Sequence, residues 1–480
     1  MQVSRALSQA AGVQAALVAM ATPLNIDLLP GMGLDPSTVA AASPNDLLVA
    51  VRADDDATLA SAVALLDELL SARDGQSGSD GFGQPVPPRT TGSALRRSEA
   101  RLAVVSVPGR NAFVEAMDAL RAGASVMVFS DNVPVQQEIA LKDEAARRGL
   151  LVMGPDCGTA IVGGVGLGFA NVVRPGPVGI VAASGTGAQQ VCSLLDAAGV
   201  GMSAVLGTGG RDLSREVRAR STLQALEMLD AHPATDLIVV LSKPPAPDVA
   251  ALVRDAAGRM RTPTIVGFLG RGEGDLTAVT SRVLGALGLP PVEPPEWPAP
   301  TERGSRPGAL RGLFSGGTLC DEAMLIAVDV LGPILSNIPL DPKWALPSDL
   351  RAAGHLMIDF GDDRLTQGRP HPMIDWTLRL DRLAAEAADP ACAVVLLDVV
   401  LGYGSHDAPA AVLTPALREA RERASADGRD LAVVVSLTGT AGDPQGLETT
   451  ARALQDAGAS VHLSNAAAAR TAASLVERSA

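Results

Sequence analysis

Cysteine is scarce in this chain, and its placement excludes two classes of protein. Only four cysteines, Cys157, Cys192, Cys320 and Cys392, occur in 480 residues, and none of them belongs to a CxxC pair. Such isolated thiols argue against a disulfide framework and against a zinc site built from cysteines. They fit a reducing compartment, so we expect a cytoplasmic protein.

Positive charge and aromatic rings are also in short supply. Lys and Arg number 39 against 53 Asp and Glu, which gives a formal net charge of −14, and aromatic residues make up 2% of the chain. Binding to nucleic acid needs cations for the phosphates and rings for base stacking, so we exclude nucleic acid as a partner.

Long apolar runs are absent as well. No run of 18 apolar residues exists, and the early apolar stretch from Val13 to Met20 is interrupted by Gln14. We therefore expect no membrane-spanning segment, no membrane partner and no signal peptide.

The chain contains instead a regular alternation of short apolar runs and helical patterns. Apolar residues make up 47% of it, and runs such as 102–108, 178–184 and 392–400 are apolar on both faces. Strands of this kind, alternating with helices, are typical of parallel sheets that helices cover on both sides. The sequence therefore predicts a doubly wound α/β fold.

Stretches rich in Gly, Ser or Pro divide the chain. Residues 71–100 and 289–310 are interpreted as linkers, because proline cannot donate ladder hydrogen bonds and breaks helices. They set off a small N-terminal α/β unit at residues 1–72. In that unit we expect strands at 13–22 and 46–53, followed by a helix in which Leu59, Val63, Leu66 and Leu70 have helical spacing.

Two turns at strand ends combine glycines with hydroxyl groups directly before a helix. Open α/β sheets bind ligands beyond the carboxyl ends of their strands. Glycines let the backbone approach an anion, and the helix N-terminus supplies N–H groups. We interpret the turns as a shared phosphate or carboxylate pocket, with ordinary capped turns as the alternative. The candidate residues are Ser184, Gly185, Thr186 and Gly187 in the first turn, and Ser315, Gly316, Gly317 and Thr318 in the second.

A third glycine-rich strand end adds Gly209, Gly210 and Arg211 as anion-binding candidates. It does not match the dinucleotide-binding motif, since Asp212 stands where that motif needs its third glycine.

Polar residues are densest in the C-terminal third of the chain. His371 lies between two prolines, and it accompanies Asp362, Asp363 and Arg369, while His406 follows another buried run. We interpret this group as catalytic, with a histidine that titrates near neutrality as general acid–base and Arg369 or Arg211 neutralising oxygen charge. No HxH or HxxxH spacing accompanies the histidines, so no metal site is predicted.

At these residues the chain resembles succinyl-CoA synthetase. The run VPGRNAFVEAMDALRAGASVMVFSDNVPV, continued by LLVMGPDCG, is similar to the CoA-binding domain of its α subunit, and PGPVGIVAASGTG to the ligase domain that follows. DFGDD and DPACAVVLLDVVLGYG are similar to the β-subunit ligase domain. The fused order and the runs GRPHPMID and LLDVVLGYGSHD resemble the FdrA family. The resemblance implies a Rossmann-like CoA-binding-type domain at 100–173 and two flavodoxin-like ligase-type domains at 176–288 and 309–480.

By this resemblance, three loops would contact CoA. The resemblance also allows a second cofactor, a nucleotide supplied through a partner subunit. The chain departs from the synthetases in three ways. No histidine lies between His232 and His355, where they carry a phosphohistidine; no segment remains for an ATP-grasp domain; and Asp156 stands where asparagine is usual. The CoA-like loops are Val107, Pro108 and Gly109, then Ser130, Asp131 and Asn132, then Pro155 and Asp156.

The FdrA resemblance implies a subunit of an oxamate carbamoyltransferase in ureide (allantoin) degradation, which forms carbamoyl phosphate. Its expected partners are a small acyl or carbamoyl substrate, phosphate, other subunits of the transferase and further copies of this chain. Two alternatives stay open: a subunit of an NDP-forming acyl-CoA synthetase, and a non-catalytic CoA-binding scaffold.

Overall fold

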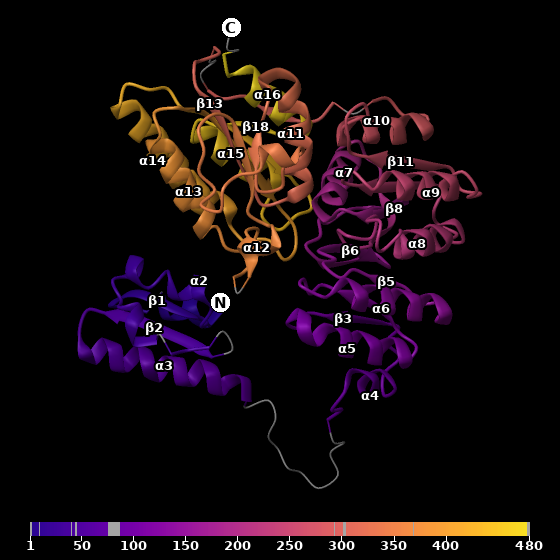
Figure 1. The fold of residues 1–480 in the computed structure, drawn as a ribbon, viewed down its shortest axis with the longest axis horizontal. Helices are drawn as coiled ribbons and strands as arrows, with labels where there is room; N and C mark the ends of the chain where they lie inside the picture. Colours follow the sequence, from indigo (N-terminus) through magenta and orange to yellow (C-terminus); the bar gives the residue numbers. More distant parts are fainter. Residues whose placement is uncertain are drawn as a thin grey trace. The chain divides into compact units, whose positions relative to one another are not determined.

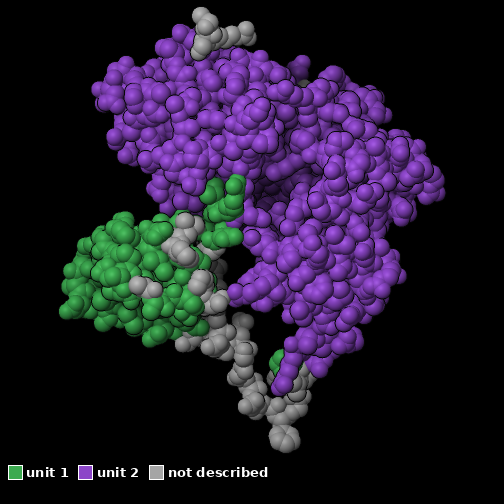
Figure 2. Space-filling view, in the orientation of Figure 1, with its two compact units in different colours: residues 1–87, 364–370 green, residues 88–363, 371–480 purple. Residues whose placement is uncertain are grey.

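The structure is a computed structural model of the whole chain. It describes residues 2–477 apart from Gln9, Ala40, 44–45, 75–86, Val292, 301–303 and Gly368. Parts of both predicted linkers, 75–86 and 301–303, therefore lie outside the described residues. The chain forms two compact units, one of residues 1–87 and 364–370 and one of residues 88–363 and 371–480 (Figure 2). Among the helices that are described, none combines the length and apolar character needed to cross a membrane.

The smaller unit is built on a two-stranded antiparallel sheet of β1 (Val13–Met20) and β2 (Leu47–Ala53), as the sequence predicts. Its longest helix, α3 (Asp56–Asp74), lies along the sheet in Figure 1 and packs with the short helix α1 (Gln2–Ser8). Of the four residues expected to form the apolar stripe on α3, Leu66 is buried, whereas Leu59, Val63 and Leu70 are exposed. The buried face of α3 consists of Ala62 and Leu66, with Leu65 and Leu69 partly buried beside them. A four-residue helix α2 (Pro23–Ile26) and two 3-10 turns, Pro30–Met32 and Pro36–Val39, complete the unit.

The larger unit begins with a three-stranded parallel sheet, in the order β3-β4-β5. Part of the first predicted linker is ordered as a short helix, α4 (Thr91–Leu95), because Thr90 caps it and Asp118 accepts the Gly92 N–H. The elements are β3 (Leu102–Val105), α5 (Gly109–Arg121), β4 (Ser125–Val128), α6 (Val135–Arg148) and β5 (Val152–Met153).

A six-stranded sheet follows, in the order β11-β10-β8-β9-β6-β7. Its first four members are parallel, whereas β6 pairs antiparallel with both β9 and β7. The strands are β6 (Thr159–Val162), β7 (Val165–Gly168), β8 (Pro175–Ala183), β9 (Met202–Gly207), β10 (Leu237–Ser242) and β11 (Thr264–Phe268). The helices are α7 (Gly185–Ala197), α8 (Arg220–Asp230), α9 (Pro247–Ala257) and α10 (Leu276–Ala286).

The C-terminal sheet has seven strands, in the order β12-β18-β17-β16-β13-β15-β14. All neighbours are parallel except β12, which comes from the second predicted linker and pairs antiparallel with β18. The strands are β12 (Glu296–Trp297), β13 (Ala309–Phe314), β14 (Leu335–Ser336), β15 (Leu356–Asp359), β16 (Cys392–Val400), β17 (Ala432–Thr438) and β18 (Ser460–His462). The helices are α11 (Gly317–Leu331), α12 (Asp363–Thr366), α13 (Thr377–Ala388), α14 (Pro409–Ala426), α15 (Leu447–Asp456) and α16 (Asn465–Ser474).

One apolar core joins the six-stranded and seven-stranded halves. It contains Val191 and Leu195 of α7, Val283 of α10, Met324 of α11 and Ala469 of α16, all buried. Helices α7 and α10 therefore pack against α11 and α16, and Figure 1 shows α7 and α11 between the two sheets. The predicted α/β class with parallel, helix-covered sheets is confirmed, and the shared core brings the starts of α7 and α11 together.

Candidate functional site

The two glycine-rich turns meet at the starts of α7 and α11. The Ser184 hydroxyl donates to the Thr318 hydroxyl at 2.7 Å and accepts the Gly187 N–H at 3.0 Å. A Cβ on Gly316 would lie 2.7 Å from the Thr186 side chain, so the second turn needs this glycine for close approach. The first N–H groups of a helix have no intrahelical acceptor. Those available in the first turns belong to Gly185, Thr186, Gly317 and Thr318.

Asp398 already occupies part of the second turn. Its carboxylate accepts the Ser315 N–H at 2.8 Å, the Ser315 hydroxyl at 3.0 Å and the Gly316 N–H at 2.9 Å. Arg379 holds the same carboxylate in a buried ion pair at 2.8 Å. An internal carboxylate thus occupies the N–H groups of Ser315 and Gly316, which the sequence pattern assigns to a ligand. Only Gly317 and Thr318 of this turn are left to bind a ligand.

Lys243, which the sequence reasoning missed, lies beside the start of α11. Its ammonium and the Asp359 Oδ2 atom each lie 2.6 Å from the Cβ position of Gly317, and Asp321 is 3.7 Å from the ammonium. The Lys243 side chain keeps 37% exposure. Burial opposes its charge, but Asp321, Asp359 and Asp156 raise the pKa of Lys243 above its usual value. A signal existed, since Lys243 is one of three lysines and directly follows a buried strand.

Carboxyl groups outnumber cations around Lys243. Burial raises the pKa of Asp359 to about 7, and Lys243 lowers it only in part. Burial, followed by the charge of Asp363, raises the pKa of Asp156 to about 7. The pKa of Asp363 is itself raised, by burial and by Asp131. The site therefore contains carboxyl groups that exchange protons near neutral pH. In the described part of the chain, no group of three or more His, Cys, Asp or Glu is placed to hold a metal ion.

His371 lies next to this group but does not have the titration expected of it. Its Nδ1 atom accepts the Met373 N–H at 3.2 Å, and its ring packs 5.1 Å from that of Phe169. Its Nε2 atom is 3.0 Å from the Cβ position of Gly361. Burial, and then the charge of Arg379, lower the pKa of His371 to about 4. The expectation of titration near neutrality is therefore wrong, and the imidazole is neutral at pH 7.

The other predicted catalytic residues are placed differently. Asp362 lies near Asp359, whose pKa it helps to raise. Arg369 belongs to segment 364–370 of the smaller unit. His406 accepts the Ala408 N–H at 3.0 Å through Nδ1, and its own N–H donates to the Met373 carbonyl at 2.9 Å. His406 is thus a loop residue that anchors neighbouring backbone.

The three CoA-like loops come together at the end of the three-stranded sheet. The Ser130 hydroxyl accepts the Val107 N–H at 3.1 Å, and the Ser130 carbonyl accepts the Asp156 N–H at 3.0 Å. A Cβ on Gly109 would clash with the Asp131 backbone, so the loops are packed closely. Pro155 precedes Asp156 there, while Pro108 and Asn132 complete the other two loops.

These loops place carboxyl groups and cations close enough to interact. Burial, the charge of Asp363 and, to a smaller extent, that of Asp131 raise the pKa of Asp156 to about 7, while Lys243 and Arg211 lower it. Charges of both signs therefore lie near these loops, and we assign no step to CoA.

The third glycine-rich turn, Gly207 to Asp212, has a packing role. A Cβ on Gly209 would clash with the Pro155 carbonyl, and one on Gly210 would lie 3.4 Å from Asp156. Arg211 donates to the Val133 carbonyl at 2.7 Å and lies 3.0 Å from Glu138. A buried lysine, Lys142, bonds Glu138, Asp212 and the Thr208 carbonyl. This network fixes Arg211 in place, so it is not a free cation for a ligand.

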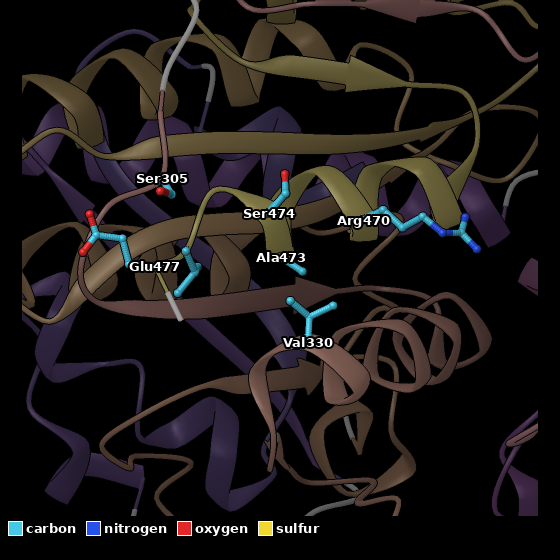
Figure 3. Close-up of a pocket in the computed structure, with 7 residues that line it drawn as sticks. Ser305, Val330, Arg470, Ala473, Ser474 and Glu477 are labelled. Carbon is cyan, nitrogen blue, oxygen red and sulfur yellow. The ribbon is translucent and has the colours of Figure 1, made fainter. Parts of the chain in front are cut away.

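Two surface pockets lie elsewhere. One surrounds the C-terminal half of α16 and is lined by Ser305, Val330, Arg470, Ala473, Ser474, Val476 and Glu477, of which Figure 3 labels all but Val476. The other, of about 280 Å³, is formed by the loop after β11 (269–275) with Glu322, Asp329 and Arg470 among its lining. That loop is where the synthetase resemblance would place a phosphohistidine. Neither pocket includes a predicted site residue.

Comparison with known proteins gives two family matches. Residues 313–475 match the CoA-ligase family, and residues 1–85 match the heavy metal-associated domain of AllF. Residues 1–85 contain neither cysteine, whose thiolate is the strong soft ligand of heavy metals, nor histidine, whose imidazole binds Zn, Cu and Ni. The residues present therefore do not fit a heavy metal.

Individual relatives cover more of the chain. YahF of Escherichia coli (strain K12) is 40% identical over 478 residues, which is 95% of this chain and 92% of YahF. Succinate–CoA ligase [ADP-forming] subunit alpha 2 of Archaeoglobus fulgidus is 29% identical over 240 residues, 46% of this chain and 83% of that subunit. The dinucleotide forming acetyl-coenzyme A synthetase 1 of Ca. Korarchaeum cryptofilum aligns with 83% of this chain and 86% of its own, at 17% identity and a TM-score of 0.33, too low to support an argument.

Proposed function

The chain belongs to the CoA-ligase-like family that includes YahF, and from this premise we propose that it is the group-transfer subunit of a carbamoyltransferase. It is related to succinyl-CoA synthetase and to NDP-forming acyl-CoA ligases. Among such proteins, the resemblance to the FdrA family favours oxamate carbamoyltransferase as the activity. In that enzyme this chain would act in a complex with other subunits. The observation that carries the proposal is the hydrogen bond between Ser184 and Thr318, which joins two helix N-termini beside Lys243.

The proposed reaction uses an oxalurate-like ureide and inorganic phosphate. A phosphate oxygen attacks the carbamoyl carbon, the bond from this carbon to the ureide nitrogen breaks, and the phosphate proton moves to that nitrogen. The products are oxamate and carbamoyl phosphate. The first-turn amides of Gly185, Thr186, Gly317 and Thr318 hold the phosphate, and Lys243 offsets its charge.

The proton transfer is assigned to Asp156 rather than to His371. A group acts best as acid and base when its pKa is near the working pH. The pKa of Asp156 is raised to about 7, whereas that of His371 is lowered to about 4. This role would explain why position 156 is an aspartate where the synthetases that the chain resembles have asparagine.

A second candidate function is an NDP-forming acyl-CoA synthetase subunit. The CoA-ligase match over residues 313–475 and the similarity to the Archaeoglobus fulgidus subunit favour it. Against it stands the absence of histidine between His232 and His355, because the synthetase reaction passes phosphate through a histidine there in the proteins that this chain resembles.

A carbamoyl-transfer assay on the complex purified with its native partner subunits tests the proposal. We expect carbamoyl phosphate to form from oxalurate and phosphate, and Asp156→Asn to lower turnover by about 10²-fold or more. Incubation of the same complex with labelled ATP is the second arm. A phosphohistidine on this chain, without carbamoyl transfer, would contradict the proposal and favour the synthetase.

A further inference from the structure

Asp359 and Lys243 form a donor–acceptor pair at the first residue of α11. Asp359 ends β15 and Lys243 follows β10, so the two halves of the larger unit each contribute one member. Both reach the Cβ position of Gly317, at 2.6 Å. The pair is held from behind, because the Asp359 N–H donates to Asn337 at 2.9 Å and its carbonyl accepts the Asn337 amide at 2.8 Å.

Each member has unused hydrogen-bonding capacity on the side of Gly317. The Asp359 Oδ1 atom accepts the Gly361 N–H at 2.9 Å, while Oδ2 points toward Gly317 and Lys243. A carboxylate offers about four acceptor positions, and an ammonium offers three donors. Asp321 lies 3.7 Å from the Lys243 ammonium and can engage at most one of these donors directly. An acceptor and a donor therefore stand next to each other at the end of a phosphate-binding turn.

This arrangement matches a primary amide. In a carbamoyl group the N–H donates and the C=O accepts, so Asp359 complements the nitrogen and Lys243 the oxygen. A methyl group in place of the NH₂ would leave the buried Asp359 acceptor unpaired, which costs about 1–3 kcal/mol. A carboxylate in that place would set two negative charges side by side.

We infer that Asp359 and Lys243 determine specificity for a carbamoyl group next to a phosphate, against a methyl ketone or a carboxylate of the same shape. The inference rests on the proposed function and adds to it the residues that read the transferred group. It separates the two candidate functions, because the carboxylate substrate of an acyl-CoA ligase has no N–H to donate.

Three stable phosphonates test the inference on the full chain by calorimetric titration at pH 8, above the pKa of about 7 of Asp359, where its carboxyl group is ionised and accepts. Phosphonoacetamide carries the NH₂, acetonylphosphonate carries a methyl group in its place, and phosphonoacetate carries a carboxylate oxygen. We expect phosphonoacetamide to bind at least about 10-fold more tightly than either of the others. Equal binding of the first two would overturn the inference while leaving the phosphate site and the proposed function in place. Binding of none of the three would overturn both.

Variants make the test specific to the pair. In Asp359→Asn the side-chain NH₂ replaces Oδ2, so a donor faces the ligand, and we expect the preference for the amide to be lost and phosphonoacetate to gain. Lys243→Met should weaken all three ligands. Asp329→Asn, on an exposed position of the same helix, is the matched control and should keep the wild-type order. An Asp359→Asn chain that folds and retains the full preference would also overturn the inference.

Discussion

The two glycine-rich turns share a sequence pattern but differ in what satisfies their backbone. At the start of α7, a neutral hydroxyl, that of Ser184, caps the helix, and the nearest group to Gly185 is the Thr159 hydroxyl. At the start of α11, the ionised pair of Asp398 and Arg379 holds the turn, and Lys243 and Asp359 face Gly317. The turn at the start of α7 is therefore surrounded by neutral groups, and the turn at the start of α11 by charged groups.

This difference teaches that a glycine-rich strand end does not by itself define a ligand site. An internal carboxylate satisfies helix N-terminal amides as well as a phosphate does. Asp398 lies near the carboxyl end of a buried strand, β16, where its charge is stabilised by Arg379 and by the N–H groups of the turn.

The largest effect is expected at the charged turn. Asp398→Ala removes the carboxylate that binds Ser315, Gly316 and Arg379, and leaves the buried guanidinium unpaired. Breaking a buried ion pair in this way costs about 3–5 kcal/mol. Urea unfolding should show this loss of unfolding free energy, with an unchanged dependence on urea concentration.

Asp443→Ala is the matched control for that variant. Asp443 is also buried and accepts the Val172 and Thr440 N–H groups, but no arginine or lysine is among its recorded hydrogen-bond partners. We expect it to cost less than Asp398→Ala. Equal losses in the two variants would mean that the charge of Arg379 adds nothing at the α11 turn.

The second prediction concerns pH, which should affect only the charged turn. Burial raises the pKa of Asp359 to about 7, with Lys243 opposing and Asp321 and Asp362 assisting. A carboxyl group whose pKa is higher in the folded state favours folding at low pH, and this contribution is lost as pH rises from about 4 to about 7. Relative to Asp359→Asn, the wild type should therefore lose a few kcal/mol of unfolding free energy over that range. His371, whose pKa is lowered to about 4, is neutral over most of this range.

Thermal unfolding at pH 5 and pH 8 checks this. The Tm of Asp359→Asn should exceed that of the wild type by more at pH 8 than at pH 5. Thr159→Val, beside the neutral turn, should show the same difference from wild type at both pH values. If the Tm difference between wild type and Asp359→Asn did not change with pH, the pKa of Asp359 would not be raised in the folded protein.

Much of the fold could be predicted from the sequence, because local patterns determine it. Strands apolar on both faces, such as 178–184 and 392–400, predicted the parallel sheets, and β8 and β16 form along these runs. The stripe on α3 was predicted correctly only at Leu66, because the small residue Ala62, and not Val63, completes the buried face. A proline-rich segment was taken for a linker although Glu296 and Trp297 form an edge strand.

The site was predicted less completely, since it depends on contacts between distant residues. Both glycine-rich turns were recognised, and the structure brings them together through Ser184 and Thr318. Lys243 was not recognised although it is one of three lysines and directly follows a buried strand, because its neighbours Asp321 of α11 and Asp359 of β15 come from the other half of the larger unit. The lowered pKa of His371 depends on Arg379 and on burial, neither of which the local sequence shows.

The third prediction compares one added methyl group in each turn. In Gly317→Ala the new Cβ would lie 2.6 Å from Lys243 and from Asp359, so both side chains must move. In Gly185→Ala the nearest atom is the Thr159 hydroxyl oxygen at 3.2 Å, which needs only a small shift. We expect Gly317→Ala to weaken binding of inorganic phosphate by about 10-fold or more, and Gly185→Ala to weaken it less. Calorimetric titration measures both, and the reverse order would place the phosphate at α7 alone.

The smallest effect is expected from the cap of the neutral turn. Ser184→Ala removes the acceptor for the Gly187 N–H and the link to Thr318, and loss of such a cap costs about 0.5–2 kcal/mol. Ser464→Ala is a close control, because Ser464 caps α16 through the Ala467 N–H at 3.1 Å and joins the Thr277 hydroxyl at 2.7 Å. Both variants should lower the unfolding free energy by similar amounts in urea. Only Ser184→Ala should also weaken phosphate binding, because only that cap orients the two facing helix starts. Equal phosphate affinity in both variants would mean that the hydroxyl pair is a structural link between the two halves and not part of the anion site.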